Sequence, residues 1–197
     1  MAVGPITNPT TPIAIGTVAT PTWASDVEDN VNQGLFNANE RALVVPAYAA
    51  SAYAAAGTFG GWSDAGSLNG YLQTAAAGNY LVFNISGVVG QVPTGSYGKA
   101  WELNSVSLRM KTSGSSAATM NIWSLDNQSS NSAVGLITSI NASPGSTSGT
   151  GDQFITVPVQ TPPYVFNNDH LVFVAVTAGN SADRVYSITI NYQTYGL

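Results

Sequence analysis

A two-residue hydrophobic repeat runs from about residue 44 to the end of the chain, and it restricts the fold more than any other feature. In RVYSITINYQTY, residues 184–195, Tyr186, Ile188 and Ile190 alternate with smaller or more polar side chains. Successive side chains of a β-strand point to opposite faces, so this alternation predicts a strand with one buried face. It places Tyr186 on the same face as Ile188 and Ile190.

The same repeat predicts several further strands. In QFITVPV, residues 153–159, Pro158 indicates an edge strand or a strand end, because proline cannot donate to a neighbouring strand. HLVFVAV, residues 170–176, has apolar side chains on both faces, which predicts a central strand covered on both sides. The remaining candidates are VSLRMK at 106–111 and the segments 79–86, 118–125 and 133–140.

Turn-forming runs such as SPGSTSGTGD and FNNDH separate these segments. Seven or eight short strands with such connections are typical of an antiparallel jelly roll or β-sandwich, which we expect over residues 44–197. The alanine-rich stretch at 46–57 fits helix and strand equally well. The absence of a repeat of fixed length argues against a propeller or a solenoid.

Two segments precede the expected β domain. Residues 1–20 carry three prolines among threonines and small apolar residues, which predicts an extended arm. Residues 21–43 are expected to form a short amphipathic helix that serves in oligomerisation, because Ser25 and Glu28 have the spacing of a capping box. One stripe of this helix would contact other subunits or partners, or would cover the end of the chain's own sandwich; its members are Trp23, Val27, Val31 and Leu35.

Charge is scarce, since only 8% of the residues are charged and the net charge is −5. The five basic residues are scattered along the sequence, whereas phosphate binding needs clustered Lys and Arg, so we expect no nucleic-acid partner. The chain has no cysteine, which excludes thiol chemistry. We also expect cytosolic synthesis and no membrane partner, because neither a signal peptide nor a membrane-spanning run is recognisable. Low charge with many hydroxyl side chains is common in virion components.

No motif in the sequence carries a catalytic reaction. His170 is the only histidine, and its place at the start of a strand beside turn residues indicates a structural role. The acids of the β region are isolated, and as loop acids we expect them to be solvated rather than paired for glycoside hydrolysis. We find no calcium loop and no phosphate-binding loop. The sequence therefore predicts a protein that is not an enzyme and that has no cofactor and no metal.

Aromatic residues near predicted turns and strand ends are a second lead. Exposed aromatic rings offer flat apolar surfaces against which sugar rings pack, so Trp62 and Trp123 are candidate glycan contacts. Alternatively these rings fill the core of the sandwich and its rims, as large apolar side chains commonly do.

The order of these segments resembles that of small structural proteins of tailed bacteriophages. The resemblance covers roughly residues 20–197 and rests on four stretches: TPTWASDVEDNVN, WELNSVSLRMKT, ATMNIWSLDN and NNDHLVFVAVTAGNSADRVYSITINYQ. It implies a non-enzymatic protein of the virion that forms a homotrimer and contacts the major capsid protein or other virion proteins. The missing shaft repeat favours a capsid cement or decoration protein. The alternatives are a tail or head fibre module that binds a receptor or a host surface glycan, and a glycosidase-like hydrolase.

Overall fold

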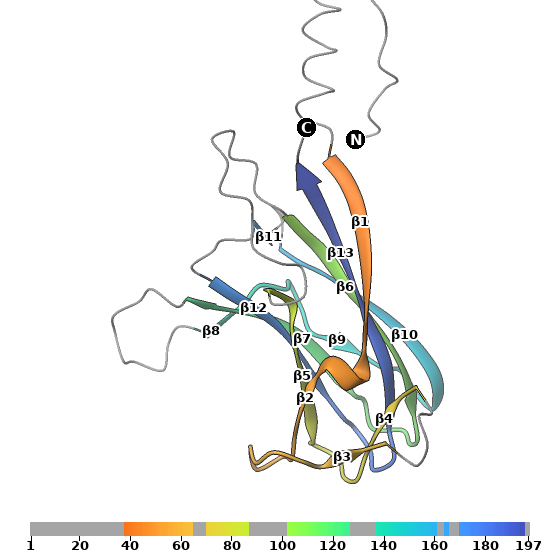
Figure 1. Ribbon diagram of the computed structural model, residues 1–197. Helices are drawn as coiled ribbons and strands as arrows, with labels where there is room; N and C mark the ends of the chain where they lie inside the picture. Colours follow the sequence, from red (N-terminus) through yellow and green to blue (C-terminus); the bar gives the residue numbers. More distant parts are fainter. Residues whose placement is uncertain are drawn as a thin grey trace, which may run out of the picture.

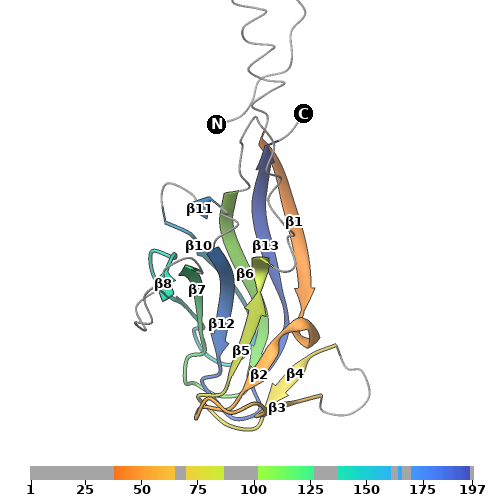
Figure 2. The same ribbon diagram turned by 60° about the vertical axis from the view of Figure 1, so that its left-hand side comes forward.

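Two antiparallel sheets lie face to face and enclose a hydrophobic core (Figures 1 and 2). This computed structural model describes residues 38–64, 70–86, 102–126, 137–160, 164–165 and 170–195. Nearly all of these residues lie in strands or in short turns between them, so the predicted antiparallel sandwich is confirmed.

Sheet A is built around β6 (Glu102–Thr112) and β13 (Arg184–Tyr195). Its strand order is β10 (Gly151–Pro158), β6, β13, β4 (Leu72–Thr74) and β3 (Trp62–Ser63). The first described strand, β1 (Ala38–Pro46), pairs along the C-terminal part of β13, and β11 (Tyr164–Val165) pairs with β6. Pro158 is the last residue of β10, an edge strand on this path, as its chemistry predicts.

Sheet B is built around β12 (His170–Thr177), which lies between β5 (Tyr80–Asn84) and β7 (Thr119–Asp126). β2 (Ser51–Tyr53) extends the sheet beyond β5, and β8 (Ile137–Ser139) extends it beyond β7. β9 (Gly145–Ser146) pairs with β7 as well. Sheet B thus combines strands that lie far apart in the sequence.

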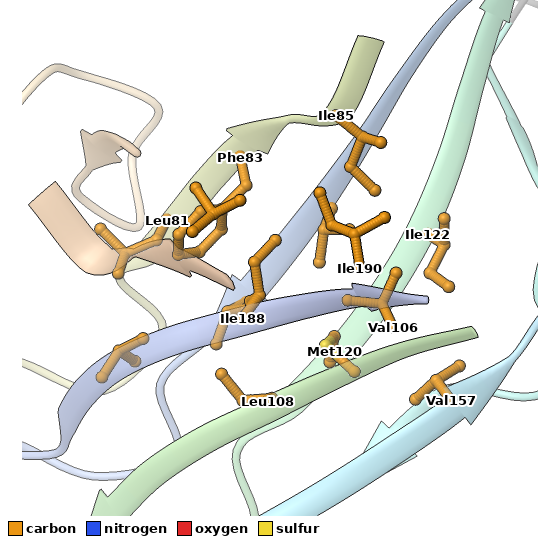
Figure 3. Close-up of a cluster of buried hydrophobic side chains, with 14 of the residues drawn as sticks. Leu81, Phe83, Ile85, Val106, Leu108, Met120, Ile122, Val157, Ile188 and Ile190 are labelled. Atoms are coloured by element: carbon orange, nitrogen blue, oxygen red, sulfur yellow. The ribbon is translucent and has the colours of Figure 1, made fainter. Parts of the chain in front are cut away.

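The core lies between the two sheets and follows the two-residue repeat. Val172, Val174 and Val176 of β12 have no exposed surface, and neither do Ile188 and Ile190 of β13. Figure 3 shows such side chains from both sheets pointing into the same layer. Since burying one such side chain fully contributes roughly 1.5–3 kcal/mol, this layer is the main source of stability.

The N-terminal limit of the β domain differs from the prediction. Residues 38–43 were expected in the helical segment, but they belong to β1, which pairs with β13 from Ala38↔Tyr195 to Pro46↔Ser187. Pairing with β13 and burial of Val45 outweigh the local helix signal here. The ambiguous stretch 46–57 contains both kinds of structure, a 3-10 helix η1 (Ala47–Ala49) followed by β2.

The arm at 1–20 and most of the segment at 21–43 lie outside the described residues, so both remain predictions. β1 begins and β13 ends at the same end of the sandwich, while β3 lies at the other end (Figures 1 and 2). None of the described segments is a helix with the length and apolarity that crossing a bilayer requires.

Candidate ligand-binding face

The outer face of sheet B, hereafter the B face, is apolar at the position of its central strand. The inward side chains of β12 alternate with Leu171, Phe173 and Ala175, which point away from the core. Leu171 is 43% exposed and Phe173 is partly buried. The prediction that this strand is covered on both sides is therefore wrong for the described residues, because no described layer packs on its outer side.

A shallow groove of about 290 Å³ lies on the B face and crosses several strands. β2, β5, β12 and β7 line this groove with Ser51, Val82, Asn84, Leu125, Leu171 and Phe173. Apolar walls with a few polar groups are typical of small-molecule and cofactor sites. The groove therefore has the composition of a ligand site, although it is open to solvent along its length.

Trp123 adjoins the groove. Its register partners are Phe173 on β12 and Ser139 on β8. Phe173 in turn is the register partner of Asn84 on β5. Trp123 is partly buried, so part of its ring is accessible from the B face. Across the sheet, the rings of Phe173 and Trp123 therefore lie between the amide of Asn84 and the hydroxyl group of Ser139.

A second aromatic group closes the other end of the B face. Tyr53 and Tyr80 are register partners on β2 and β5, and their rings stack with centroids 5.1 Å apart. Phe59 stacks on Tyr53 at 4.7 Å and is 80% exposed. These three rings form a continuous stack whose last member is open to solvent.

Small side chains separate the two aromatic groups. The row between them contains Ser51, Val82, Ala175 and Asn121. Because strands rise about 3.3 Å per residue, rings four residues apart along a strand are about 13 Å apart. None of the side chains that the structure describes on this face is charged. The B face thus suits an elongated, uncharged ligand that has flat apolar surfaces and polar edges.

The structure separates the two tryptophans that the sequence nominated. Trp62 lies in β3 of sheet A and packs against the core, and its indole Nε1 has no hydrogen-bond partner among the described residues. Trp62 therefore matches the core-filling alternative, whereas Trp123 lies on the B face. The stripe of Trp23, Val27, Val31 and Leu35 lies outside the described residues.

The described acidic residues do not gather into a reaction centre. Within the described ranges, no three His, Cys, Asp or Glu side chains are close enough to hold a metal ion. Asp183 was expected to be solvated, but it is fully buried and accepts hydrogen bonds from backbone N–H groups. His170 begins β12, as expected, and pairs with Asp126 in the register.

Sequence reasoning missed Phe173 and Leu171, together with Tyr53 and Phe59 of the stack, whereas Tyr80 was among the aromatic residues that it placed near strand ends. The sequence did contain evidence for Phe173 and Leu171, since the segment 170–176 has apolar side chains on both faces of the expected strand. A strand of this kind has either a second covering layer or an apolar surface, and the sequence offered no further amphipathic segment in the β domain to cover it. The stack of three rings depends on the register of β2 and β5, which local patterns do not specify.

Comparison with known proteins gives a limited picture. No protein-family model matches this chain, and no curated protein matches it. Among solved structures, a xylan-binding module CBM15 is 13% identical, with a TM-score of 0.45, over 78% of this chain and 97% of that chain. A carbohydrate binding module from glycoside hydrolase family 9 (Cel9A) of Ruminococcus flavefaciens FD-1 is 10% identical, with a TM-score of 0.33, over 49% of this chain and 74% of that chain.

A third structure, a carbohydrate binding module of family 29, is 15% identical with a TM-score of 0.26, over 79% of this chain and 90% of that chain. At these identities and TM-scores the likeness is confined to the β-sandwich architecture, and nothing about a ligand follows from it.

Proposed function

We propose that this protein is a non-enzymatic glycan-binding protein and that a neutral polysaccharide chain binds along its B face. The observation that carries this proposal is the uncharged groove between two aromatic groups, with Phe173 and Trp123 at one end and the Tyr53 stack at the other.

The chemistry of the B face favours a sugar over a protein partner. A pyranose ring has flat C–H faces that pack on aromatic rings, and hydroxyl groups at its edge that need hydrogen-bond partners. The B face offers partly exposed rings beside Ser51, Asn121 and Ser139. Since no described side chain on it is charged, the ligand gains nothing from carrying charge of its own.

The test is binding to neutral polysaccharides by affinity electrophoresis and titration calorimetry, with a β-1,4-glucan, a mannan and a galactan as probes. Trp123→Ala and Phe173→Ala should each weaken binding to the preferred polymer about tenfold, which corresponds to a loss of about 1.4 kcal/mol. Each substitution removes one ring face, and the partly exposed positions leave the core intact.

Phe154→Ala is the matched control, because Phe154 is 69% exposed and lies on β10 of the other sheet. Its affinity should equal that of the unaltered chain. If no neutral polysaccharide binds, or if Phe154→Ala weakens binding as much as Trp123→Ala does, the B face is not the glycan site.

We infer further that this domain is carried on a virion as a tail or head fibre module. The pairing of Ala38 with Tyr195 supports a module tethered at one end, because it places the point where residues 1–37 join the sandwich at the end away from β3 (Figure 1). The capsid cement assignment depends on the arm and on the segment 21–43, and it stays a prediction. Cryo-electron microscopy of the parent particle distinguishes a fibre tip from a capsid surface.

A further inference from the structure

Three of the five basic residues lie together on the outer face of sheet A, where the fold brings Arg184 beside Arg109 and Lys111. Arg184 of β13 is the register partner of Lys111, and Arg109 lies two residues from Lys111 on the same side of β6. Arg109 and Lys111 are exposed, while their neighbours Leu108 and Met110 are fully buried. The basic residues that the sequence scatters are therefore partly clustered by the fold.

A β-bulge brings an aromatic side chain into this cluster. The register of β13 against β6 shifts between Val185 and Ser187, so that Tyr186 is the extra residue. Val185 has no exposed surface, and Tyr186 lies on the outer face instead of sharing the buried face with Ile188, which corrects the prediction from strict alternation.

Two adjacent tyrosine rings lie between the two guanidinium groups, and the four side chains come from β6, β13 and the residue before β4. Arg109 lies over the ring of Tyr186 at 5.4 Å, Tyr186 meets Tyr71 edge to face at 5.7 Å, and Arg184 lies over Tyr71 at 4.8 Å. The Nε of Arg184 also donates to Oε1 of Gln73 at 3.0 Å. These contacts hold both guanidinium groups in place, so a ligand would not have to order them.

Both guanidinium groups have neutral partners. Asp183, next to Arg184 in sequence, is buried and accepts hydrogen bonds from the backbone N–H groups of Ser113, Gly179 and Asn180. Asp152 of β10 is the register partner of Lys111. Within the described ranges, no ion pair joins Arg109 or Arg184 to an acidic side chain.

We propose that this basic-aromatic patch, made up of Arg109, Lys111, Arg184, Tyr71 and Tyr186, is a second binding site that takes the carboxylate-bearing sugar units of an acidic polysaccharide. A guanidinium group binds a carboxylate through two parallel N–H donors. The partly exposed tyrosine rings add apolar surface on which the C–H groups of a sugar can pack. The positive charge of the patch is complementary to the negative charge of such a ligand, whereas the B face has no charge to attract it. The proposal does not depend on the function of the B face.

The experiment compares two forms of one polymer. The full chain should bind polygalacturonate, and it should bind the fully methyl-esterified form at least tenfold more weakly, because the ester removes the charge and keeps the sugar. Binding to polygalacturonate should weaken as sodium chloride rises from about 50 to about 300 mM, since exposed charges are screened. Equal binding to both forms would overturn the proposal.

Substitutions then assign the site. Arg109→Gln and Arg184→Gln should each weaken polygalacturonate binding about fivefold or more. Arg184→Lys should bind more tightly than Arg184→Gln but less tightly than the unaltered chain, because lysine keeps the charge and loses the two-point contact. Arg41→Gln is the control, since it removes one exposed positive charge from β1, outside the patch. An equal effect of Arg41→Gln means that net charge alone acts, and it rejects the site.

Two further measurements separate this site from other ligands. Trp123→Ala should leave polygalacturonate binding unchanged while it weakens binding to the neutral polymer, so either proposal can fail without the other. A single-stranded oligonucleotide that binds as tightly as polygalacturonate, with the same dependence on Arg109 and Arg184, would show a general polyanion site and contradict the assignment to a sugar.

Discussion

Asp183 shows how one buried carboxylate fixes the connection between the two sheets. It lies just before β13, in the turn that leads from β12 of sheet B to sheet A. Its side chain accepts from the N–H groups of Ser113, Gly179 and Asn180 at 2.8, 3.0 and 2.9 Å, and from the Ser113 hydroxyl at 3.1 Å. Backbone donors, rather than a cation, compensate for the burial of this charge.

Asp183→Ala should lower the free energy of unfolding by about 3 kcal/mol, because buried donors lose a charged acceptor that water cannot replace. The measurement is urea denaturation followed by tryptophan fluorescence. Asp152→Ala removes an exposed carboxylate from β10 and should change stability by no more than about 0.5 kcal/mol. Equal losses in the two variants would contradict the structural role of Asp183.

Single residues were the least predictable level of the molecule. Trp62 and Trp123 have the same side chain and were nominated for the same reason, yet one packs against the core and the other lies on the B face. Asp183 was expected in solvent and is buried. In each case the environment depends on which strands pair, and a single side chain carries no information about that pairing.

Strands were predicted well from alternation, and their irregularities were not. The segment 106–111 lies within β6, 153–159 overlaps β10, and 79–86 and 118–125 overlap β5 and β7. The bulge at Tyr186 was missed because it depends on the partner strand. The start of β1 was missed because its residues also suit a helix, and only pairing with β13 selects the strand.

β1 offers a direct test of its register. Val45 is 3% exposed and its neighbour Val44 is 63% exposed. Val45→Asp should cost about 3 kcal/mol or more of unfolding free energy, because it places an unpaired charge in the core. Val44→Asp should cost no more than about 0.5 kcal/mol. Denaturation curves of the two variants are the measurement, and a shift of β1 by one residue would reverse their order.

The assembled state is the property of the whole molecule that the sequence addresses most directly. Residues 21–37 carry the stripe of Trp23, Val27, Val31 and Leu35, and a short helix of this kind is marginal unless it packs against a partner. If three copies associate through this stripe, each B face of the trimer contributes to binding of one polymer, and the apparent affinity rises without any new contact.

We therefore expect a homotrimer that dissociates when Val27 and Val31 are both changed to Asp. Sedimentation velocity is the measurement, and the isolated subunits should keep the affinity for a short oligosaccharide while losing affinity for the polymer. Val3→Asp, in the arm at 1–20, should leave the trimer intact. A stable monomer of the unaltered chain would remove the prediction.

The pairing of Ala38 with Tyr195 also determines how the domain responds to mechanical force. A pull that separates these two residues breaks the β1–β13 ladder one rung at a time, so each step opposes only one or two hydrogen bonds. A pull on Ala38 against a ligand held on the body of the sandwich runs along the axis of β1, and it loads all nine register pairs together. The domain should consequently resist drag while tethered by its N-terminal side, and unzip easily when its two ends are drawn apart.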